Sequence, residues 1–280
     1  MKAEAIKEYY IINGELRDTN DLEIFSKIEK PPIYEVIRVI KRVPLFLEDH
    51  LERMFQSANI INYSIERSEA EITRDIRELI HKNQIDNLNI KLISTDVERN
   101  GKVFLAYFIE SFYPPEEYYR EGIRTILFHY ERENPNAKVL ISSFKEQVAK
   151  ELKEKGAFEA LLVNKHGYIP EGSRSNMFFV KGDKVYTAPK GDVLLGITRK
   201  HILSICNKLN IKVIEENIHV EDLNSLDGGF MSGTSVNVLP ITTIDNIKID
   251  SINNKIIKEI NNTYVREIEK YINSYNGKWI

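Results

Sequence analysis

The chain has 280 residues, of which 42% are hydrophobic and 29% are charged, so it can bury one large core or two smaller ones. Its formal net charge is −3 and no basic stretch is sustained, which argues against a nucleic-acid partner, and no apolar run approaches the roughly 18 residues that cross a membrane. A single cysteine, Cys206, excludes an intramolecular disulfide and a multi-cysteine metal site, so we predict no metal.

The first half of the chain predicts a mixed α+β arrangement. Its opening residues lack the apolar run and cleavage site of a signal peptide, and with the lone thiol this favours a cytoplasmic protein. Helices are expected at 48–62 and 68–82, the second begun by Ser68 with Glu71 at capping-box spacing. Strands are expected at 8–12, 33–40, 44–47, 89–94 and 102–110, the last two joined as a hairpin at Asn100-Gly101.

The second half predicts more strands and two helices. The helices are expected at 142–156, where Gly156 stands in the usual C-terminal position, and at 198–209. The strands are expected at 157–164, 176–180, 184–187 and 229–232. Proline-containing segments place a domain junction between residues 115 and 135. We therefore expect an α/β chain of the α+β type with two domains, residues 1–120 and 121–280.

Three clusters combine small residues with hydroxyl groups or a charge, namely 171–176, 196–199 and 232–235. Gly196-Ile197-Thr198 directly precedes a predicted helix, where free backbone N–H groups and the helix dipole favour a phosphate. Taken alone, this cluster favours an ordinary threonine N-cap over a phosphate site, and Gly233-Thr234-Ser235 is no more than an ordinary loop. Only their combination carries a functional meaning.

In this order and spacing the clusters resemble a known family. The motifs are Tyr34-Glu35-Val36, Asp49-His50-Leu51-Glu52-Arg53, Asn136-Ala137-Lys138, Glu171-Gly172-Ser173-Arg174-Ser175-Asn176, Leu195-Gly196-Ile197-Thr198-Arg199 and Met231-Ser232-Gly233-Thr234-Ser235. They are similar to those of the class IV aminotransferases, or fold type IV pyridoxal-phosphate enzymes. The family includes branched-chain aminotransferases, D-amino acid aminotransferases and aminodeoxychorismate lyases. The resemblance implies pyridoxal 5'-phosphate as cofactor, a cofactor site between two domains, and a homodimer.

The resemblance implies that Lys138 is the catalytic lysine, because it precedes the Glu171 motif by the family's spacing. Such a lysine holds the cofactor as a Schiff base and moves a proton at the substrate Cα. Lys138 could also be an ordinary surface lysine, and Lys145 is a nearby competitor on the polar side of a predicted helix. We expect Lys138 to carry the chemistry.

The resemblance also assigns the cofactor contacts. Glu171 would pair with the protonated pyridine nitrogen, and Arg53 of the His-x-x-Arg motif would bind the phosphate. Ile197, Thr198 and Thr234 would complete the phosphate cup. Tyr34 matches a family tyrosine beside the cofactor, although an aromatic residue in a strand is as often part of the core.

Departures from the family pattern bear on the substrate. Thr95-Asp96-Val97 replaces the Arg-Gly pair of D-amino acid aminotransferases and many lyases, so the arginine that would grip a carboxylate there is absent. As in branched-chain members, Ser235, Val236 and Lys91 could hold the carboxylate instead, which favours a branched-chain-like L-amino acid and a 2-oxo acid as substrates. Arg174 within the Glu-Gly-Ser motif could bind a second carboxylate or point to solvent. The alternatives are a 4-amino-4-deoxychorismate lyase that releases pyruvate and a non-catalytic relative of this fold.

Overall fold

A computed structural model of the chain describes residues 4–28, 33–98, 100–132, 135–139 and 142–275. The described residues form two compact units. Unit 1 combines residues of 1–112, 137–141 and 268–280, and unit 2 combines 113–136 with 142–267. The division into two domains at residue 120 stays a prediction. No helix within the described residues has both the length and the hydropathy needed to span a membrane.

Unit 1 is built on an antiparallel sheet with the strand order β2-β1-β6-β5-β3-β4. The hairpin expected at Asn100-Gly101 is confirmed and is longer than predicted, because Val97 pairs with Gly101 across a turn in which Gly101 has a φ of 70°. The strands are β1 (Tyr9–Ile12), β2 (Glu15–Asp18), β3 (Ile33–Ile40), β4 (Val43–Pro44), β5 (Asn87–Val97) and β6 (Gly101–Ile109).

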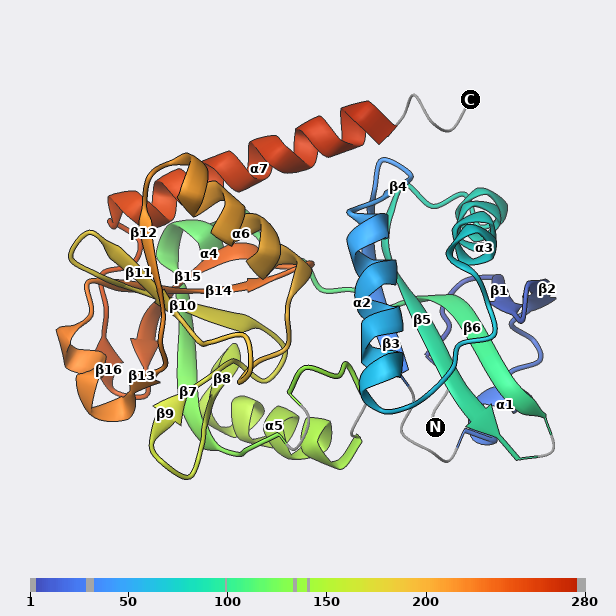
Figure 1. Cartoon of the computed structure of the whole chain (residues 1–280), viewed down its shortest axis with the longest axis horizontal. Coiled ribbons are helices and arrows are strands. Elements are labelled where there is room, and N and C mark those ends of the chain that lie inside the picture. The colour runs from blue at the N-terminus through green and yellow to red at the C-terminus, as the bar shows by residue number, and fades with distance from the viewer. Residues whose placement is uncertain (1–3, 29–32, 99, 133–134, 140–141, 276–280) are drawn as a thin grey trace. The chain divides into compact units, whose positions relative to one another are not determined.

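Two helices, α2 (Leu47–Ile60) and α3 (Glu69–Lys82), cover one face of this sheet (Figure 1). Both are amphipathic, and their buried stripes pack on the apolar residues of β3, β5 and β6. The predicted capping box is confirmed, since the Ser68 side chain accepts from the Glu71 N–H and the Glu71 carboxylate accepts from the Ser68 N–H. The opposite face packs on the short helix α1 (Glu23–Ser26), which was not predicted from the sequence.

The strand predicted at 44–47 is wrong. Strand β4 stops at Pro44, and Phe46 adopts a left-handed conformation with a φ of 52° before α2 begins at Leu47. An apolar run that turns inward at a helix start has the same composition as a short buried strand, so periodicity cannot separate the two. Lys41 and Arg42 form the tight turn between β3 and β4, and both residues have positive φ angles.

Unit 2 is built on an eight-stranded sheet with the order β12-β11-β10-β14-β15-β7-β8, to which β16 adds beside β15. Neighbours pair antiparallel except β11 with β12, β15 with β7, and β7 with β8, which are parallel. The strands are β7 (Ile123–His129), β8 (Glu159–Val163), β10 (Asn176–Lys181), β11 (Lys184–Thr187), β12 (Lys212–Glu215), β14 (Gly228–Gly233), β15 (Asn237–Ile244) and β16 (Ile247–Lys248). A separate pair joins β9 (Tyr168–Ile169) to β13 (Ile218–His219).

The helices of unit 2 include the two that were predicted. They are α4 (Glu116–Glu121), α5 (Ser142–Lys155), α6 (Ile197–Lys208), the 3-10 helix η1 (Val220–Ser225) and α7 (Lys255–Tyr275), whose last residues belong to unit 1. Strand β15 was not predicted, because Pro240 lies inside it, although Pro240 pairs with Phe230 of β14. Helix α7 was not predicted either, although its buried residues Ile257, Ile260 and Tyr264 recur at helical spacing.

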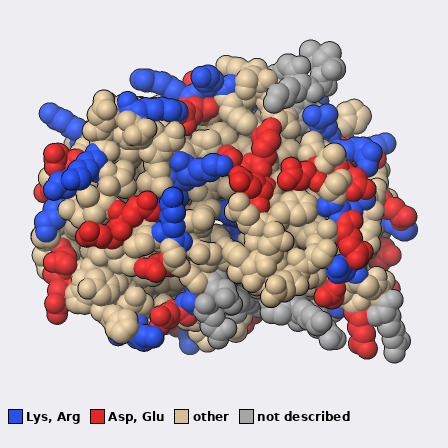
Figure 2. Space-filling view, viewed as in Figure 1, with Lys and Arg blue, Asp and Glu red and all other residues tan. Residues whose placement is uncertain are grey.

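Charged side chains of both signs are intermixed on the face of the chain drawn in Figure 2.

Candidate active site

Lys138 is fixed through its backbone to two elements of unit 1. Its carbonyl oxygen accepts from the Tyr34 N–H at 3.1 Å, and its own N–H donates to the Ser57 Oγ of α2 at 3.2 Å. The neighbouring Val139 forms a bridge to Ile33, so the segment adds to the end of β3. The Nζ of Lys138 lies 4.7 Å from the centroid of the Tyr34 ring. The structure thus brings together two of the residues singled out from the sequence.

A buried charged network occupies the face of α2 on which Ser57 lies. Glu35 and His50 are fully buried and Arg53 is 7% exposed. The Arg53 Nε and one terminal nitrogen donate to the Glu35 carboxylate at 2.7 and 2.6 Å, and the His50 Nδ1 is 2.8 Å from the same carboxylate. Arg53 therefore makes a bidentate ion pair with Glu35, which fixes the plane of its guanidinium group.

The protonation states in this network follow from its geometry. Burial alone raises the pKa of Glu35, but attraction by Arg53 and hydrogen bonds from His50 and Arg53 outweigh it and lower the pKa to about 2. Burial lowers the pKa of His50. Neutral His50 must then donate from Nδ1 to the ionised Glu35, which leaves an acceptor at Nε2. That Nε2 is buried and has no hydrogen-bond partner among the described residues.

Lys91 lies on the face of the sheet that also carries Tyr34. Its side chain is 2% exposed, and its Nζ lies 5.8 Å from the Tyr34 ring centroid and 6.0 Å from that of Tyr107. The ammonium forms an ion pair with Glu4. Lys91 and Lys138 thus share one aromatic neighbour, Tyr34.

Glu171 of unit 2 is buried and held by two partners. Its Oε1 is 2.8 Å from the Nε of Arg132, and its Oε2 accepts from the Leu194 N–H at 3.3 Å. Arg132 also donates to the Ser173 carbonyl at 2.7 Å and lies over the Phe144 ring. Arg132 was not predicted from the sequence, because it lies in a polar segment six residues before the predicted lysine and has no motif of its own.

A second buried carboxylate, Glu159, organises the loop that carries Glu171. Its Oε1 accepts from the Ser173 N–H at 3.1 Å and from the Ser173 hydroxyl, and its Oε2 accepts from the Ser175 hydroxyl at 2.9 Å. Gly172 leaves room for this arrangement, because a Cβ there would lie 2.3 Å from the Ser175 Oγ. The small residues of the 171–176 motif therefore make room for the hydrogen bonds of Glu159. The sequence analysis missed Glu159 because it begins an otherwise apolar strand, β8.

The start of α6 faces the same loop. Its N-cap, Gly196, makes no side-chain cap hydrogen bond, and its first turn holds no acidic residue, so the N-terminal N–H groups at Ile197 and Thr198 suit an anion. The Asn176 side chain donates to the Leu194 carbonyl at 2.8 Å, and a Cβ on Gly196 would lie 2.0 Å from its Oδ1. The Thr198 hydroxyl is buried, 3.2 Å from the Tyr264 hydroxyl.

The loop that follows β14 carries the remaining predicted residues. Thr234 and Ser235 form its turn, and both are partly exposed. The Val236 N–H donates to the Gly233 carbonyl at 3.1 Å, and the Val236 carbonyl accepts from the Tyr119 hydroxyl at 3.1 Å. Of the backbone groups proposed for a substrate carboxylate, the N–H of Val236 is thus already engaged within the turn.

Arg174 is mostly exposed and packs along its own loop. One terminal nitrogen donates to the Phe158 carbonyl at 3.0 Å, its guanidinium lies over the Phe158 ring, and its Nε is 3.7 Å from Glu159. These contacts hold the Arg174 side chain against Phe158 and Glu159.

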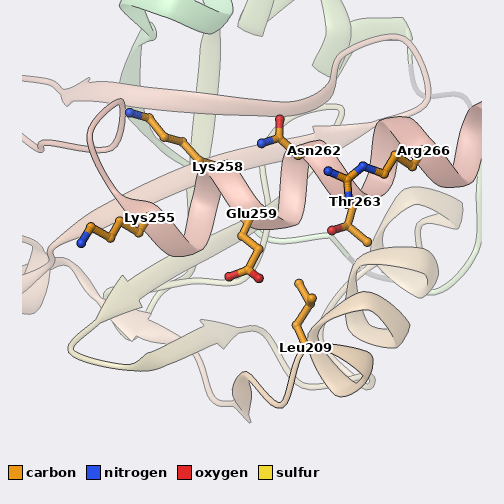
Figure 3. Close-up of a pocket in the computed structure, with 7 residues that line it drawn as sticks. All are labelled: Leu209, Lys255, Lys258, Glu259, Asn262, Thr263 and Arg266. Atoms are coloured by element: carbon orange, nitrogen blue, oxygen red, sulfur yellow. The ribbon is translucent and has the colours of Figure 1, made fainter.

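A shallow hollow between the end of α6 and α7 lies apart from the predicted site residues. Leu209 and the α7 side chains of Lys255, Glu259 and Arg266 line it (Figure 3). None of the residues predicted for cofactor or substrate is among its lining residues. Among the described residues, no three His, Cys, Asp or Glu side chains are placed to hold a metal ion.

Residues 32–244 match the protein family described as amino-transferase class IV. The chain is similar to the D-alanine aminotransferase of Bacillus licheniformis, with 26% identity over 237 residues, 76% of this chain and 78% of that one. It is similar to the branched-chain-amino-acid aminotransferase of Pseudomonas aeruginosa, with 29% identity over 214 residues, 71% and 70% of the two chains. Its fold matches the branched-chain amino acid aminotransferase of Escherichia coli, with a TM-score of 0.85 at 23% identity over 94% of this chain and 95% of that one. The predicted fold class is confirmed.

Proposed function

This chain belongs to the class IV aminotransferase family, and from that premise we propose that it moves an amino group between a branched-chain-like L-amino acid and a 2-oxo acid. Pyridoxal 5'-phosphate is the cofactor of the proposal, and Lys138 is its catalytic residue. The observation that supports the assignment is the placement of Lys138. Its backbone is hydrogen-bonded to β3 and to α2, the two elements that carry the Glu35–His50–Arg53 network.

The described residues include partners for both charged groups of the cofactor, its phosphate and its protonated ring nitrogen. Arg53, held by Glu35, offers a guanidinium to the phosphate, and the uncapped start of α6 at Ile197 and Thr198 offers backbone N–H groups, with Thr234 as a further contact. Glu171, beside Arg132, offers a carboxylate to a protonated ring nitrogen. We propose each of these residues as a contact of pyridoxal phosphate.

Each residue then has one task in the reaction. Pyridoxal phosphate, when bound, supplies an electron sink for the electrons left on Cα and carries the amino group. Lys138 would hold the cofactor through Nζ, and its Nζ, once free and neutral, would take the proton from the substrate Cα and return it. Tyr34, whose ring lies 4.7 Å from that Nζ, limits the positions that the amine can take. Glu171 would accept a hydrogen bond from the protonated ring nitrogen.

The substrate class rests on the carboxylate contacts. The arginine that would grip a carboxylate at the end of β5 is replaced by Thr95-Asp96-Val97, which disfavours D-amino acids and the lyase reaction. Ser235, Val236 and Lys91 are the residues that we assign to the substrate carboxylate. The Val236 N–H already donates to the Gly233 carbonyl. We therefore assign the substrate carboxylate mainly to Ser235 and Lys91.

Reductive trapping tests the lysine directly. The purified chain is loaded with pyridoxal phosphate, reduced with borohydride and digested, and the modified peptide is identified by mass spectrometry. We expect the label on Lys138, its loss in Lys138→Ala, and its retention in the matched control Lys145→Ala, because Lys145 is exposed on α5. A label on another lysine, or none, would overturn the assignment.

A substrate panel tests the reaction. L-leucine, L-glutamate, D-alanine and 4-amino-4-deoxychorismate are added separately, and cofactor absorbance, oxo acid formation and pyruvate release are recorded. We expect L-leucine to convert the cofactor to its amine form and to yield an oxo acid. Pyruvate release from the chorismate derivative without an amino acceptor would make the chain a lyase, and no reaction across the panel would make it a non-catalytic relative.

The proposal includes a homodimer in the cytoplasm. The family resemblance supports the dimer, and a free, buried Cys206, whose pKa burial raises to about 12, is compatible with a reducing compartment. Light scattering should give twice the mass of one chain. A monomeric mass at working concentration would contradict the dimer.

A further inference from the structure

Tyr264 is a polar residue at a position where packing alone calls for an apolar one. It lies in the buried stripe of α7 with Ile257 and Ile260, and its side chain is fully buried. A buried hydroxyl costs free energy unless it forms a hydrogen bond. The Tyr264 hydroxyl lies 3.2 Å from the Thr198 Oγ1, so the polar end of this side chain is directed at the start of α6.

The Thr198 hydroxyl depends on this contact. Thr198 is the second residue of α6 and is 2% exposed. A helical threonine often donates to the carbonyl four residues earlier, but here that carbonyl, of Leu194, accepts from the Asn176 side chain at 2.8 Å. The Tyr264 hydroxyl is the hydrogen-bond partner of the Thr198 side chain among the described residues. The orientation of the Thr198 hydroxyl is therefore set from α7.

A hydrogen bond between two hydroxyls can run in either direction, and the direction decides what Thr198 offers to a ligand. If Thr198 donates to Tyr264, only its lone pairs are left, and they repel an anion. If Tyr264 donates, the Thr198 proton is free to join the N–H groups at the uncapped start of α6. An anion at this helix start therefore selects the second direction, in which the two hydrogen bonds strengthen each other.

Further contacts between α6 and α7 hold the Tyr264 ring in place. The ring of His201, about one turn after Thr198, has its centroid 6.4 Å from that of Tyr264. The Glu267 carboxylate, about one turn after Tyr264, lies 3.4 Å from the His201 Nδ1 and 2.5 Å from the Lys208 Nζ. These pairs join the two helices beside Tyr264, so the hydroxyl reaches Thr198 from a fixed backbone.

We propose that Tyr264 is a positioning residue for the cofactor phosphate: its hydroxyl donates to Thr198 and turns the Thr198 proton toward a phosphate oxygen. Thr198 contacts the ligand, and Tyr264 acts through Thr198. The inference rests on the proposed function for the identity of the anion. It adds a residue that lies 66 positions after Thr198 and outside every motif that the sequence analysis singled out.

The test compares ligands with and without a phosphate group. Pyridoxamine 5'-phosphate and pyridoxamine carry no aldehyde for Lys138, so calorimetric titration of the cofactor-free full chain reports their noncovalent contacts alone. Tyr264→Phe keeps the ring and removes the hydroxyl. We expect it to weaken pyridoxamine 5'-phosphate binding about three- to tenfold and to leave pyridoxamine binding unchanged. Inorganic phosphate, the third probe, should lose affinity as the phosphate ester does.

A double-variant cycle with Thr198→Val separates a positioning role from a packing role. Thr198→Val removes the hydroxyl that the proposal places on the phosphate and should weaken pyridoxamine 5'-phosphate binding about ten- to hundredfold. In that background Tyr264→Phe should change the affinity less than about twofold, because Tyr264 then has no hydroxyl to act through. Tyr168→Phe removes a hydroxyl from an exposed tyrosine of β9 in the same unit. It is the matched control and should change nothing.

Three results overturn the inference: wild-type affinity of Tyr264→Phe for the phosphate ester, an equal loss for pyridoxamine, or additive losses in the double variant. The proposed function fails separately. A chain that binds no pyridoxamine 5'-phosphate, but binds inorganic phosphate and loses that affinity in Tyr264→Phe, refutes the cofactor and supports this role of Tyr264. A wild-type chain that binds neither phosphate probe overturns both.

Discussion

The network of Glu35, His50 and Arg53 gives the sharpest test of how this chain prepares its candidate phosphate site. In Glu35→Gln the side chain keeps its size but loses its charge, and its amide nitrogen faces the donors of Arg53 and His50. Arg53, 7% exposed, is left without its counter-charge. We expect both the folded state and the affinity for pyridoxal phosphate to suffer, because the guanidinium is no longer held in one plane.

Two routes give the size of the effect. The pKa of Glu35 is lowered to about 2 from an ordinary value of 4.5, which corresponds to about 3 kcal/mol of stabilisation of the ionised form in the folded chain. Removal of one partner from a buried ion pair costs about 3 to 5 kcal/mol. The two figures agree, so the variant should lose about 3 kcal/mol of unfolding free energy at pH 7.

The pH dependence has a definite sign. A carboxyl whose pKa is depressed by folding stabilises the chain fully above its unfolded pKa and loses that contribution as the pH falls toward its folded pKa. The contribution of Glu35 is therefore complete above about pH 4.5 and is lost progressively toward pH 2. Glu35→Gln lacks it at every pH. The difference in unfolding free energy between wild type and variant should be constant from pH 7 to pH 5 and should shrink below.

Urea unfolding of the cofactor-free chain, followed by circular dichroism between pH 7 and pH 3, measures this difference without the stabilisation that a bound ligand adds. Glu52→Gln, an exposed change on the same helix, is the matched control and should stay within about 0.5 kcal/mol of wild type. A loss below about 1 kcal/mol for Glu35→Gln at pH 7, or a difference that does not shrink at low pH, would refute the reasoning.

Three further changes test unit 2. Arg132→Gln removes the 2.8 Å ion pair of Glu171. We expect kcat/KM to fall about tenfold, or about 1.4 kcal/mol, in the steady-state assay with the best donor. An unchanged kcat/KM would show that Arg132 does not contribute to the site. Glu159→Gln disturbs the serine and backbone donors of a fully buried carboxylate and should cost about 2 to 3 kcal/mol in urea unfolding. Gly196→Ala adds a Cβ that would lie 2.0 Å from a neighbouring amide oxygen and should cost about 1 to 3 kcal/mol by thermal unfolding, whereas Gly191→Ala, with nothing within 4 Å, should not.

Elements with a local chemical signature were predictable from the sequence. The capping box at Ser68, the hairpin at Asn100-Gly101 and the glycine after α5 each depend on a few adjacent residues, and the structure confirms all three. Strand β15 was not predictable in this way, because a proline such as Pro240 normally argues against a central strand. The pairing of β15 with β14 and β7 is set by the rest of the sheet, which no local window contains.

The candidate site shows the same limit at the level of single side chains. Glu35 stands in β3 among Ile33, Ile37 and Val39, so the alternation alone indicates a buried carboxylate that needs a partner. What the alternation does not contain is the identity of that partner, since Arg53 lies 18 residues further along the chain. Glu159 presents the same problem, because the serines that satisfy it follow 14 and 16 residues later. A motif thus names the residues that meet a ligand, but the residues that hold them in position become visible only when a buried charge is traced to its partner in the folded chain.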